Sequence, residues 1–344
     1  MINNRLAMFG LLSWLLVAPA GAQIVIAHRG ASGERPEHTL AAYELAIDRG
    51  ADFVETDLVP TKDLVLVARH ENELSSTTDV ASREEFASRE RSKTIDGRLV
   101  SGWFVEDFTL AELRTLRAKE RIPGLRPANA RFNGLYQVPT FAEIVTLVRA
   151  KEAETGRRIG LYPELKHPTF LLQNAGIDMV DLILRELKKA GLSEADLLYI
   201  QCFEVGALRR LDQRSDFKLV QLVEATGGPA DETALDYPGM VSSSGLAEIA
   251  TYADAIGADL RMIFTTEGAP SGLVDAAHDA GLKVHAWTMR KENAYLPPVL
   301  RRGDAESATG DVLGMVTYLK VAGVDGIITD DPGPVVEALS ASSN

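Results

Sequence analysis

The chain has a single cysteine in 344 residues, and aromatic residues make up only 6% of it. One thiol cannot form an internal disulfide, so the chain is not a disulfide-framework protein and its stability must come from a hydrophobic core. Cys202 lies in an apolar, strand-like context, which favours a buried, inert thiol over a nucleophile. Glycine and proline occur at ordinary levels, which excludes collagen-like and low-complexity chains.

Positive charge is also scarce, with 36 Lys and Arg against 49 Asp and Glu and a net charge of −13. Affinity for nucleic acid comes largely from basic side chains that neutralise phosphates, so this balance argues against a nucleic-acid partner. An anionic small molecule would have to be attracted locally, because the overall field repels it.

Long hydrophobic runs are missing. The apolar stretch at 7–17 is shorter than the roughly 20 residues that span a bilayer. It follows Arg5 and precedes a small-x-small pattern ending at Ala22, as in a cleaved export signal. We therefore predict a signal peptide over 1–22, cleavage before Gln23, a periplasmic or secreted protein and no stable membrane insertion. An uncleaved anchor and an N-terminal core helix are the alternatives.

Short strand-like segments alternate with amphipathic helical segments along the rest of the chain. The strand-like segments are 24–28, 52–58, 64–70, 159–166, 197–203, 217–223, 255–260, 283–288 and 326–329. Helical patterns such as 39–49, 140–155 and 176–190 follow most of them, which implies parallel strands with crossover helices. About eight such repeats favour an α/β fold of the TIM (β/α)8 barrel type over an open sheet.

A segment of 69 residues, 71–139, breaks this alternation, and we refer to it as the insertion. It contains the charge-rich stretch 82–93 and loop signals at 126–134. Loops of this length in compact domains are usually functional, and this one leaves the carboxyl end of a strand-like segment, where barrel active sites lie. We predict one domain over 23–344, with the insertion over the active site.

Acidic side chains stand out on the second strand-like segment. Strand alternation places Phe53, Glu55 and Asp57 on one face, with the carboxylates about 7 Å apart along the strand. Buried like charges need a partner, so an inward-facing pair predicts a metal site. An exposed edge strand is the alternative, and it fits poorly because Phe53 shares the face.

The same alternation places further polar residues at strand ends. His28 ends the first segment, and Glu164 and Lys166 end 159–166. The third segment is expected to point Leu64, Leu66, Ala68 and His70 into the barrel. Three carboxylates favour a hard cation, Ca²⁺ or Mg²⁺, over Zn²⁺. Two histidines outside the metal shell can serve as general acid and base near neutral pH.

The other histidines carry weaker signals. His38 precedes a helical pattern and His278 lies on an amphipathic helix, so we interpret both as structural or solvated. His167 and His285 remain undecided. The sequence has no zinc-protease motif, no dinucleotide fingerprint, no Walker loop and no nucleophile elbow.

Motifs spread over nearly the whole mature chain resemble those of glycerophosphodiester phosphodiesterases, and the long insertion is similar to that of exported bacterial members. They are His28-Arg29-Gly30, Pro36-Glu37-His38-Thr39, Glu55-x-Asp57, His70, GLYPELK from Gly160 to Lys166, Gln201-Cys202-Phe203, His285-Ala286-Trp287-Thr288 and Thr329-Asp330. Two positions depart from the family pattern. Glu71 stands where Asp is usual after the second His, and Arg69 stands where an apolar residue is frequent.

The resemblance implies a TIM barrel that hydrolyses glycerophosphodiesters, such as glycerophosphocholine and glycerophosphoethanolamine, to an alcohol and sn-glycerol 3-phosphate. It implies one divalent cation, with Ca²⁺ preferred over Mg²⁺, bound by Glu55, Asp57 and Glu164. His28 and His70 would be the general acid and base, and Arg29 and Lys166 would bind the phosphate. Gln201, Phe203 and Trp287 would line the glycerol side of the substrate pocket. Direct attack by water and attack by the glycerol 2-hydroxyl through a cyclic phosphate both stay open, as does a homodimer.

Two other functions compete with this one. A phospholipase D-like or phosphoinositide phospholipase C-like enzyme could use the same barrel, with an apolar entrance around Trp103-Phe104 and Phe108. A secreted protein that only binds phosphodiesters or sugars, or acts as an adhesin, would be expected to lack a histidine or carboxylate of the site. The two histidines, His28 and His70, and the three carboxylates, Glu55, Asp57 and Glu164, are all present.

Overall fold

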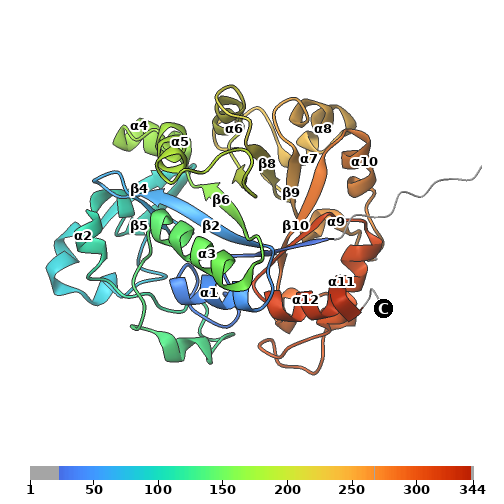
Figure 1. The fold of residues 1–344 in the computed structure, drawn as a ribbon, viewed down its shortest axis with the longest axis horizontal. Helices are drawn as coiled ribbons and strands as arrows, with labels where there is room; N and C mark the ends of the chain where they lie inside the picture. The colour runs from blue at the N-terminus through green and yellow to red at the C-terminus, as the bar shows by residue number, and fades with distance from the viewer. Residues whose placement is uncertain (1–22, 267, 342–344) are drawn as a thin grey trace, which may run out of the picture.

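Eight parallel strands close into a barrel in the computed structural model, which describes residues 23–266 and 268–341 (Figure 1). In order around the barrel the strands are β1 (Ile24–Ala27), β11 (Gly326–Thr329), β10 (Lys283–Met289), β9 (Ala255–Asp259), β8 (Lys218–Val223), β7 (Tyr199–Cys202), β6 (Gly160–Leu165) and β2 (Phe53–Pro60). Pairing of β1 with β2 closes the ring, so the predicted TIM barrel is confirmed. The predicted signal peptide lies outside the described residues.

Helices surround the barrel and bury their apolar faces against it (Figure 1). They are α1 (Leu40–Asp48), α3 (Phe141–Thr155), α4 (Pro168–Ala175), α5 (Met179–Lys189), α6 (Val205–Asp212), α7 (Tyr237–Met240), α8 (Ser243–Ile249), α9 (Leu260–Ile263), α10 (Leu273–Asp279), α11 (Val312–Val321) and α12 (Pro332–Ala341), with 3-10 turns η5 (Asn293–Tyr295) and η6 (Pro298–Leu300). The helix predicted at 176–190 begins later, at Met179. Gly176 instead ends α4, a helix that the pattern did not reveal. None of the described helices is long and apolar enough to cross a membrane.

Helix α3 illustrates how local sequence fixes an element. The Thr140 side chain accepts a hydrogen bond from the backbone of Glu143, and the Glu143 side chain accepts one from the backbone of Thr140. This capping box satisfies two amide groups that the first helical turn leaves unpaired. Gly156 ends the helix with a φ of +68°, in the left-handed region.

Substituting Thr140 with alanine is expected to lower the free energy of unfolding by about 1 kcal/mol, because one half of the capping box is lost. Urea denaturation followed by circular dichroism measures this change. Thr146→Ala on the same helix is the control, since Thr146 is exposed and its hydroxyl only back-bonds to Ala142. Equal losses in the two variants would contradict the capping role.

The third strand-like segment does not belong to the barrel. Strand β3 (Leu66–Ala68) runs antiparallel to β2, and Leu64 is exposed in the turn between them, with a φ of +61°. The predicted inward face of Leu64, Leu66, Ala68 and His70 is therefore wrong. The chain has only residues 61–65 in which to turn, whereas a parallel partner needs a crossover of a dozen residues or more.

The insertion folds against this hairpin and has an apolar cluster of its own. Its elements are η1 (Val80–Ser82), η2 (Glu84–Arg89), β4 (Arg91–Ile95), β5 (Arg98–Gly102), η3 (Val105–Asp107), α2 (Leu110–Leu113) and η4 (Asn129–Phe132). The cluster combines Val59 of β2 and Val67 of β3 with Leu74, Val80, Phe86, Trp103, Val105, Phe108, Leu113, Leu116 and Val138. The extended β2–β3 hairpin thus anchors the insertion to the barrel.

Packed side chains fill the barrel interior, where Tyr162 and Tyr199 contact each other and both contact the rings of Phe53 and His285. The His285 Nδ1 lies 2.6 Å from the Tyr162 hydroxyl, and burial lowers the pKa of His285 to about 4. His285 is therefore a neutral core histidine. Cys202 is likewise buried, its thiol donates to the Leu165 carbonyl, and burial raises its pKa well above the ordinary value, as expected of an inert thiol.

Candidate active site

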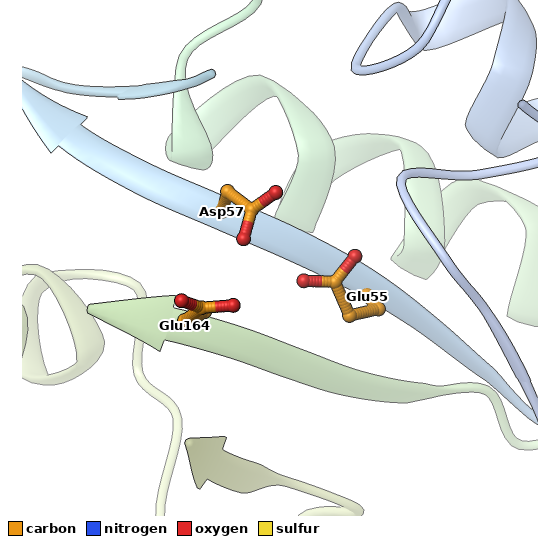
Figure 2. Close-up of side chains that lie close together, drawn as sticks. All are labelled: Glu55, Asp57 and Glu164. Carbon is orange, nitrogen blue, oxygen red and sulfur yellow. The ribbon is translucent and has the colours of Figure 1, made fainter. Parts of the chain in front are cut away.

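Three carboxylates meet at the carboxyl end of the barrel. Glu55 and Asp57 project from β2, and Glu164 projects from the adjacent strand β6, where it is in register with Asp57. Figure 2 shows the three carboxylates facing one another. One oxygen from each lies within 4.8 Å of the others, and all three residues are buried. Parallel pairing of β2 and β6 is what converts two separate sequence motifs into one cluster.

The electrostatics of this carboxylate cluster are those of a cation site. Burial, with repulsion from Asp57 and Glu164, raises the pKa of Glu55 well above its ordinary value. Burial also raises the pKa of Glu164 to about 8. Burial alone would also raise the pKa of Asp57, but Lys166 and a hydrogen bond from His38 hold that pKa well below its usual range.

The donors present fit a hard divalent cation. Three carboxylate oxygens are ligands of the kind that Ca²⁺ and Mg²⁺ prefer. The Gln201 side chain donates to Glu55 Oε1 at 3.1 Å, and its own Oε1 is buried with no hydrogen-bond partner among the described residues. A divalent cation would remove the repulsion among the carboxylates and offer this amide oxygen a partner.

Each carboxylate is oriented by its neighbours. The backbone N–H of Arg29 donates to Glu55 at 2.7 Å, and Lys166 Nζ donates to Glu164 at 2.8 Å. His38 is fully buried; its Nε2 lies 2.7 Å from Asp57 Oδ2 and its Nδ1 lies 2.6 Å from the Tyr43 hydroxyl. His38 is therefore structural, and not solvated, because it fixes the orientation of Asp57.

The His-Arg-Gly motif forms the loop that leaves β1. Gly30 has a φ of +82°, and a Cβ at this position would lie 2.6 Å from the backbone carbon of Ala42. Only glycine allows this close approach to α1. The turn places His28 at the end of its strand and lets the backbone of Arg29 reach Glu55.

His28 is held by a carboxylate from the neighbouring strand. Its Nδ1 lies 2.5 Å from Asp330 Oδ1, just after β11. Burial and the charge of Arg29 lower the pKa of His28 to about 4, against the opposing effect of Asp330. The ring is neutral near pH 7, and the Nδ1 contact with a carboxylate favours a proton on Nδ1, which leaves Nε2 able to accept one.

His70 follows β3, where the backbone N–H of Arg69 donates to the carbonyl of Asp57 at 3.0 Å. The antiparallel hairpin thus returns the chain to the level of the carboxylate cluster. Glu71 Oε1 lies 3.0 Å from His70 Nδ1. Burial, together with Arg29 and Lys166, lowers the pKa of His70 to about 3.

The two departures from the family pattern have distinct structural outcomes. Glu71 contacts His70 directly, as a shorter aspartate would be expected to do from the same position. Arg69 is fully buried and donates to the backbone carbonyls of Glu37, His38 and Thr77. It ties the end of β3 to the loop after β1 and to the insertion.

The residues expected on the substrate side lie close to one another. The Arg29 side chain contacts Glu37 at 3.0 Å and Asp57 at 3.3 Å. Lys166 Nζ lies 5.9 Å from the centre of the Phe203 ring, and Phe203 packs edge-on against Trp287 with ring centres 5.8 Å apart. Lys166, Phe203 and Trp287 thus follow one another in contact, and Arg29 lies against Asp57 of the carboxylate cluster.

Several residues that hold the site were not predicted from the sequence. Arg126 of the insertion donates to Asp330 Oδ2 at 2.6 Å, and Arg290 donates to the same oxygen at 2.8 Å. Arg121, also of the insertion, donates to Glu37 at 2.8 Å. Isolated arginines in an aperiodic segment carry no signal that distinguishes them from solvated ones, so only the tertiary structure reveals them.

The model of the glycerophosphoryl diester phosphodiesterase family matches residues 28–334. The chain belongs to this family. It is 35% identical to a glycerophosphodiester phosphodiesterase of Arabidopsis thaliana, over 90% of this chain and 83% of the relative. It is 32% identical to a glycerophosphodiester phosphodiesterase of Treponema pallidum, over 94% of this chain and 93% of the relative.

The same fold occurs in solved structures. A phosphodiesterase from Oleispira antarctica, solved in complex with the product sn-glycerol-3-phosphate, superposes with a TM-score of 0.63 at 21% identity, covering 92% of this chain and 96% of that one. Family membership confirms the prediction of a phosphoric diester hydrolase of the glycerophosphodiester phosphodiesterase type.

Proposed function

We propose that the protein hydrolyses small glycerophosphodiesters to sn-glycerol 3-phosphate and an alcohol with the help of one divalent cation. The observation that carries this proposal is the buried cluster of Glu55, Asp57 and Glu164. Two histidines, each with Nδ1 on a carboxylate, belong to the same end of the barrel. The product named for the Oleispira phosphodiesterase supports the same chemistry.

The side chains divide the work of hydrolysis. When bound, a divalent cation would polarise the phosphoryl oxygens and offset their charge. Arg29 and Lys166 supply further positive charge beside the carboxylate cluster, and both keep a raised pKa because carboxylates surround them. These groups stabilise the charge that develops on the phosphoryl oxygens in the transition state.

His28 and His70 are suited to proton transfer. Asp330 and Glu71 occupy their Nδ1 atoms, which leaves Nε2 of each ring to exchange protons with the substrate. One neutral ring accepts a proton from the nucleophile, either water or the glycerol 2-hydroxyl. The other, once protonated, donates a proton to the alcohol oxygen as its bond to phosphorus breaks.

Calcium is the cation we propose first, with magnesium second. Ca²⁺ accepts six to eight oxygen ligands in flexible geometry, whereas Mg²⁺ demands an octahedral arrangement. Carboxylates and an amide oxygen from three different strands suit the more flexible ion. The apolar stretch at 7–17 and the small residues before Gln23 support export, which would expose the site to extracellular concentrations of Ca²⁺.

The phospholipase alternatives are less well supported. Their apolar entrance was expected around Trp103-Phe104 and Phe108, but these three side chains are buried, with exposures of 8%, 0% and 0%. Trp103 also donates its indole N–H to the Phe86 carbonyl. They therefore stabilise the insertion and offer no surface to acyl chains. The binding-protein alternative is disfavoured because every proposed catalytic group is in place.

A product analysis tests the proposed function. Purified enzyme with Ca²⁺ is incubated with glycerophosphocholine, glycerophosphoethanolamine, phosphatidylcholine or phosphatidylinositol. Phosphate esters are followed by ³¹P NMR, and free choline and glycerol by ¹H NMR. We expect glycerol 3-phosphate and free choline in equal amounts from glycerophosphocholine, with little turnover of the intact lipids. Phosphocholine with free glycerol, or faster turnover of an intact lipid, would contradict the proposal.

A further inference from the structure

A row of four titratable side chains leads from His70 to the β4–β5 turn of the insertion. Glu71 contacts His70 Nδ1 through Oε1 at 3.0 Å and His167 Nε2 through Oε2 at 3.1 Å. The other nitrogen of His167, Nδ1, lies 2.6 Å from Oδ2 of Asp96. Asp96 lies in the turn between β4 and β5, so the row joins three separate parts of the chain.

His167 carries a positive charge in this arrangement. Both of its ring nitrogens face carboxylate oxygens, so both must donate, and an imidazole that donates twice is an imidazolium. Burial opposes this charge, as does nearby Lys166, but the hydrogen bonds with Asp96 and Glu71 raise the pKa of His167 to about 9. The positive ring therefore bridges two carboxylates across the pH range in which the enzyme would work.

Both His167 and Asp96 adopt left-handed backbone conformations where these contacts form. His167 has a φ of +49° directly before Pro168, which begins α4. Asp96 has a φ of +47° and Gly97 a φ of +77°, as required for a two-residue hairpin turn of type I′. A left-handed conformation costs a histidine free energy, and such strain tends to occur at functional sites. Here it directs the imidazole between Glu71 and Asp96.

We propose that His167 and Asp96 are positioning residues that hold Glu71 in place against His70, so that the hairpin turn of the insertion takes part in orienting a proton-transfer group. This inference rests on the proposed function. The Glu71 side chain is 45% exposed and has one more rotatable bond than the aspartate usual at this position. Without a second anchor it can turn into solvent, and the His70 ring loses the partner that fixes its orientation.

Two conservative substitutions test the proposal. His167→Asn removes the charge and keeps the backbone, since asparagine tolerates the left-handed region. Asp96→Asn removes one carboxylate and keeps the turn, because Asn-Gly is the preferred type I′ pair. His278→Asn is the matched control: His278 also pairs with a carboxylate, Asp325, but on α10, near the start of β11 and away from the site.

Release of glycerol 3-phosphate from glycerophosphocholine is measured with excess Ca²⁺ from pH 6 to 10. We expect kcat to fall about 10- to 100-fold in His167→Asn, the range typical of residues that orient a catalytic group, with KM changed less than about twofold. Asp96→Asn should lose less activity. Wild-type kcat should decline as the pH rises through about 9, where His167 loses its proton.

The pH profile separates positioning from structural damage. Asp96→Asn should shift the alkaline decline to lower pH, because His167 keeps Glu71 but loses a second carboxylate, while Lys166 still opposes its charge. His167→Asn should abolish that decline. Glu204 accepts two hydrogen bonds from Thr169 of α4, and burial, with a contribution from Asp96, raises its pKa to about 7. A change near pH 7 in Asp96→Asn is therefore assigned to Glu204, and only the alkaline decline reports on His167.

The outcomes that overturn the proposal are specific. Wild-type kcat and pH profile in His167→Asn would overturn it, as would a loss expressed in KM or an equal loss in His278→Asn. If His167→Asn does not fold, as judged by its thermal melting, Asp96→Asn decides: an unshifted alkaline decline overturns the proposal. Absence of glycerol 3-phosphate release by the wild-type enzyme would instead contradict the proposed function.

Discussion

Replacing Glu55 with glutamine is expected to abolish Ca²⁺ binding and to reduce kcat at least about a thousandfold, which corresponds to about 4 kcal/mol of transition-state stabilisation. Without a cation, burial and its two carboxylate neighbours raise the pKa of Glu55 and so favour its protonated form. Glutamine has nearly the shape of a protonated glutamate. It can still accept from the backbone of Arg29, and the Gln201 amide can rotate to accept from it. The metal-free fold should therefore survive.

Three measurements check this prediction on metal-stripped protein. Calorimetry should detect Ca²⁺ binding to the wild type and none to Glu55→Gln. Ca²⁺ should raise the melting temperature of the wild type and leave that of Glu55→Gln unchanged, because a ligand that binds only the folded state stabilises it. Excess EDTA should abolish wild-type turnover, and added Ca²⁺ or Mg²⁺ should restore it. Undiminished turnover in excess EDTA would contradict a catalytic cation.

The carboxylate cluster also gives the metal-free protein a pH dependence of defined sign. The pKa of Glu164 is raised to about 8 in the folded state, against roughly 4.3 in an unfolded chain. The folded state therefore binds a proton more tightly, and the stability from this group is present at low pH and lost as the pH rises to about 8. A bound cation favours the ionised carboxylates, so it should reduce this loss.

Replacing His28 with alanine is expected to lower kcat by about three orders of magnitude or more while the protein folds normally. General acid–base catalysis contributes about 10²- to 10⁴-fold, and His28 is one of the two groups proposed for it. The protein should still fold because Asp330 Oδ2 keeps its hydrogen bonds from Arg126, at 2.6 Å, and from Arg290, at 2.8 Å. No buried carboxylate is left unpaired, which is the usual source of large destabilisation.

Steady-state kinetics on glycerophosphocholine with saturating Ca²⁺, together with thermal melting, test the His28 prediction. His278→Ala is a suitable control, because it removes a histidine paired with a carboxylate far from the site. A merely twofold loss in His28→Ala would exclude His28 as acid or base. A large loss accompanied by failure to bind Ca²⁺ would assign it to the metal site instead.

Much of the barrel and of its carboxylate cluster could be predicted because the information is local. Period-two alternation places Glu55 and Asp57 on one face of a strand, and a buried pair of carboxylates needs a counter-charge wherever the strand lies. Glu164 follows from the same reasoning on β6. A parallel barrel then brings the carboxyl ends of all strands to one face.

Other features depend on contacts that the linear pattern does not encode. The direction of β3 was mispredicted from its apolar alternation, although the short turn at 61–65 already excluded a parallel crossover. The role of His38 depends on a partner 19 residues away, and that of Arg126 on a partner 204 residues away. Neither separation in sequence corresponds to the repeat of a strand or a helix, so no periodic pattern reveals these pairs.

The sequence by itself determined the fold class, the family and the identity of the carboxylates and histidines that gather at the carboxyl end of the barrel. Periodicity and ligand chemistry are properties of short segments, so both can be recognised in the sequence alone. Only the tertiary structure decided how those groups are held. Asp330, which is bound by Arg126, contacts His28, and Glu71, which is bound by His167, contacts His70. The physical reason is that buried charges must be paired, and their partners come from whichever loops the barrel and the insertion bring into reach.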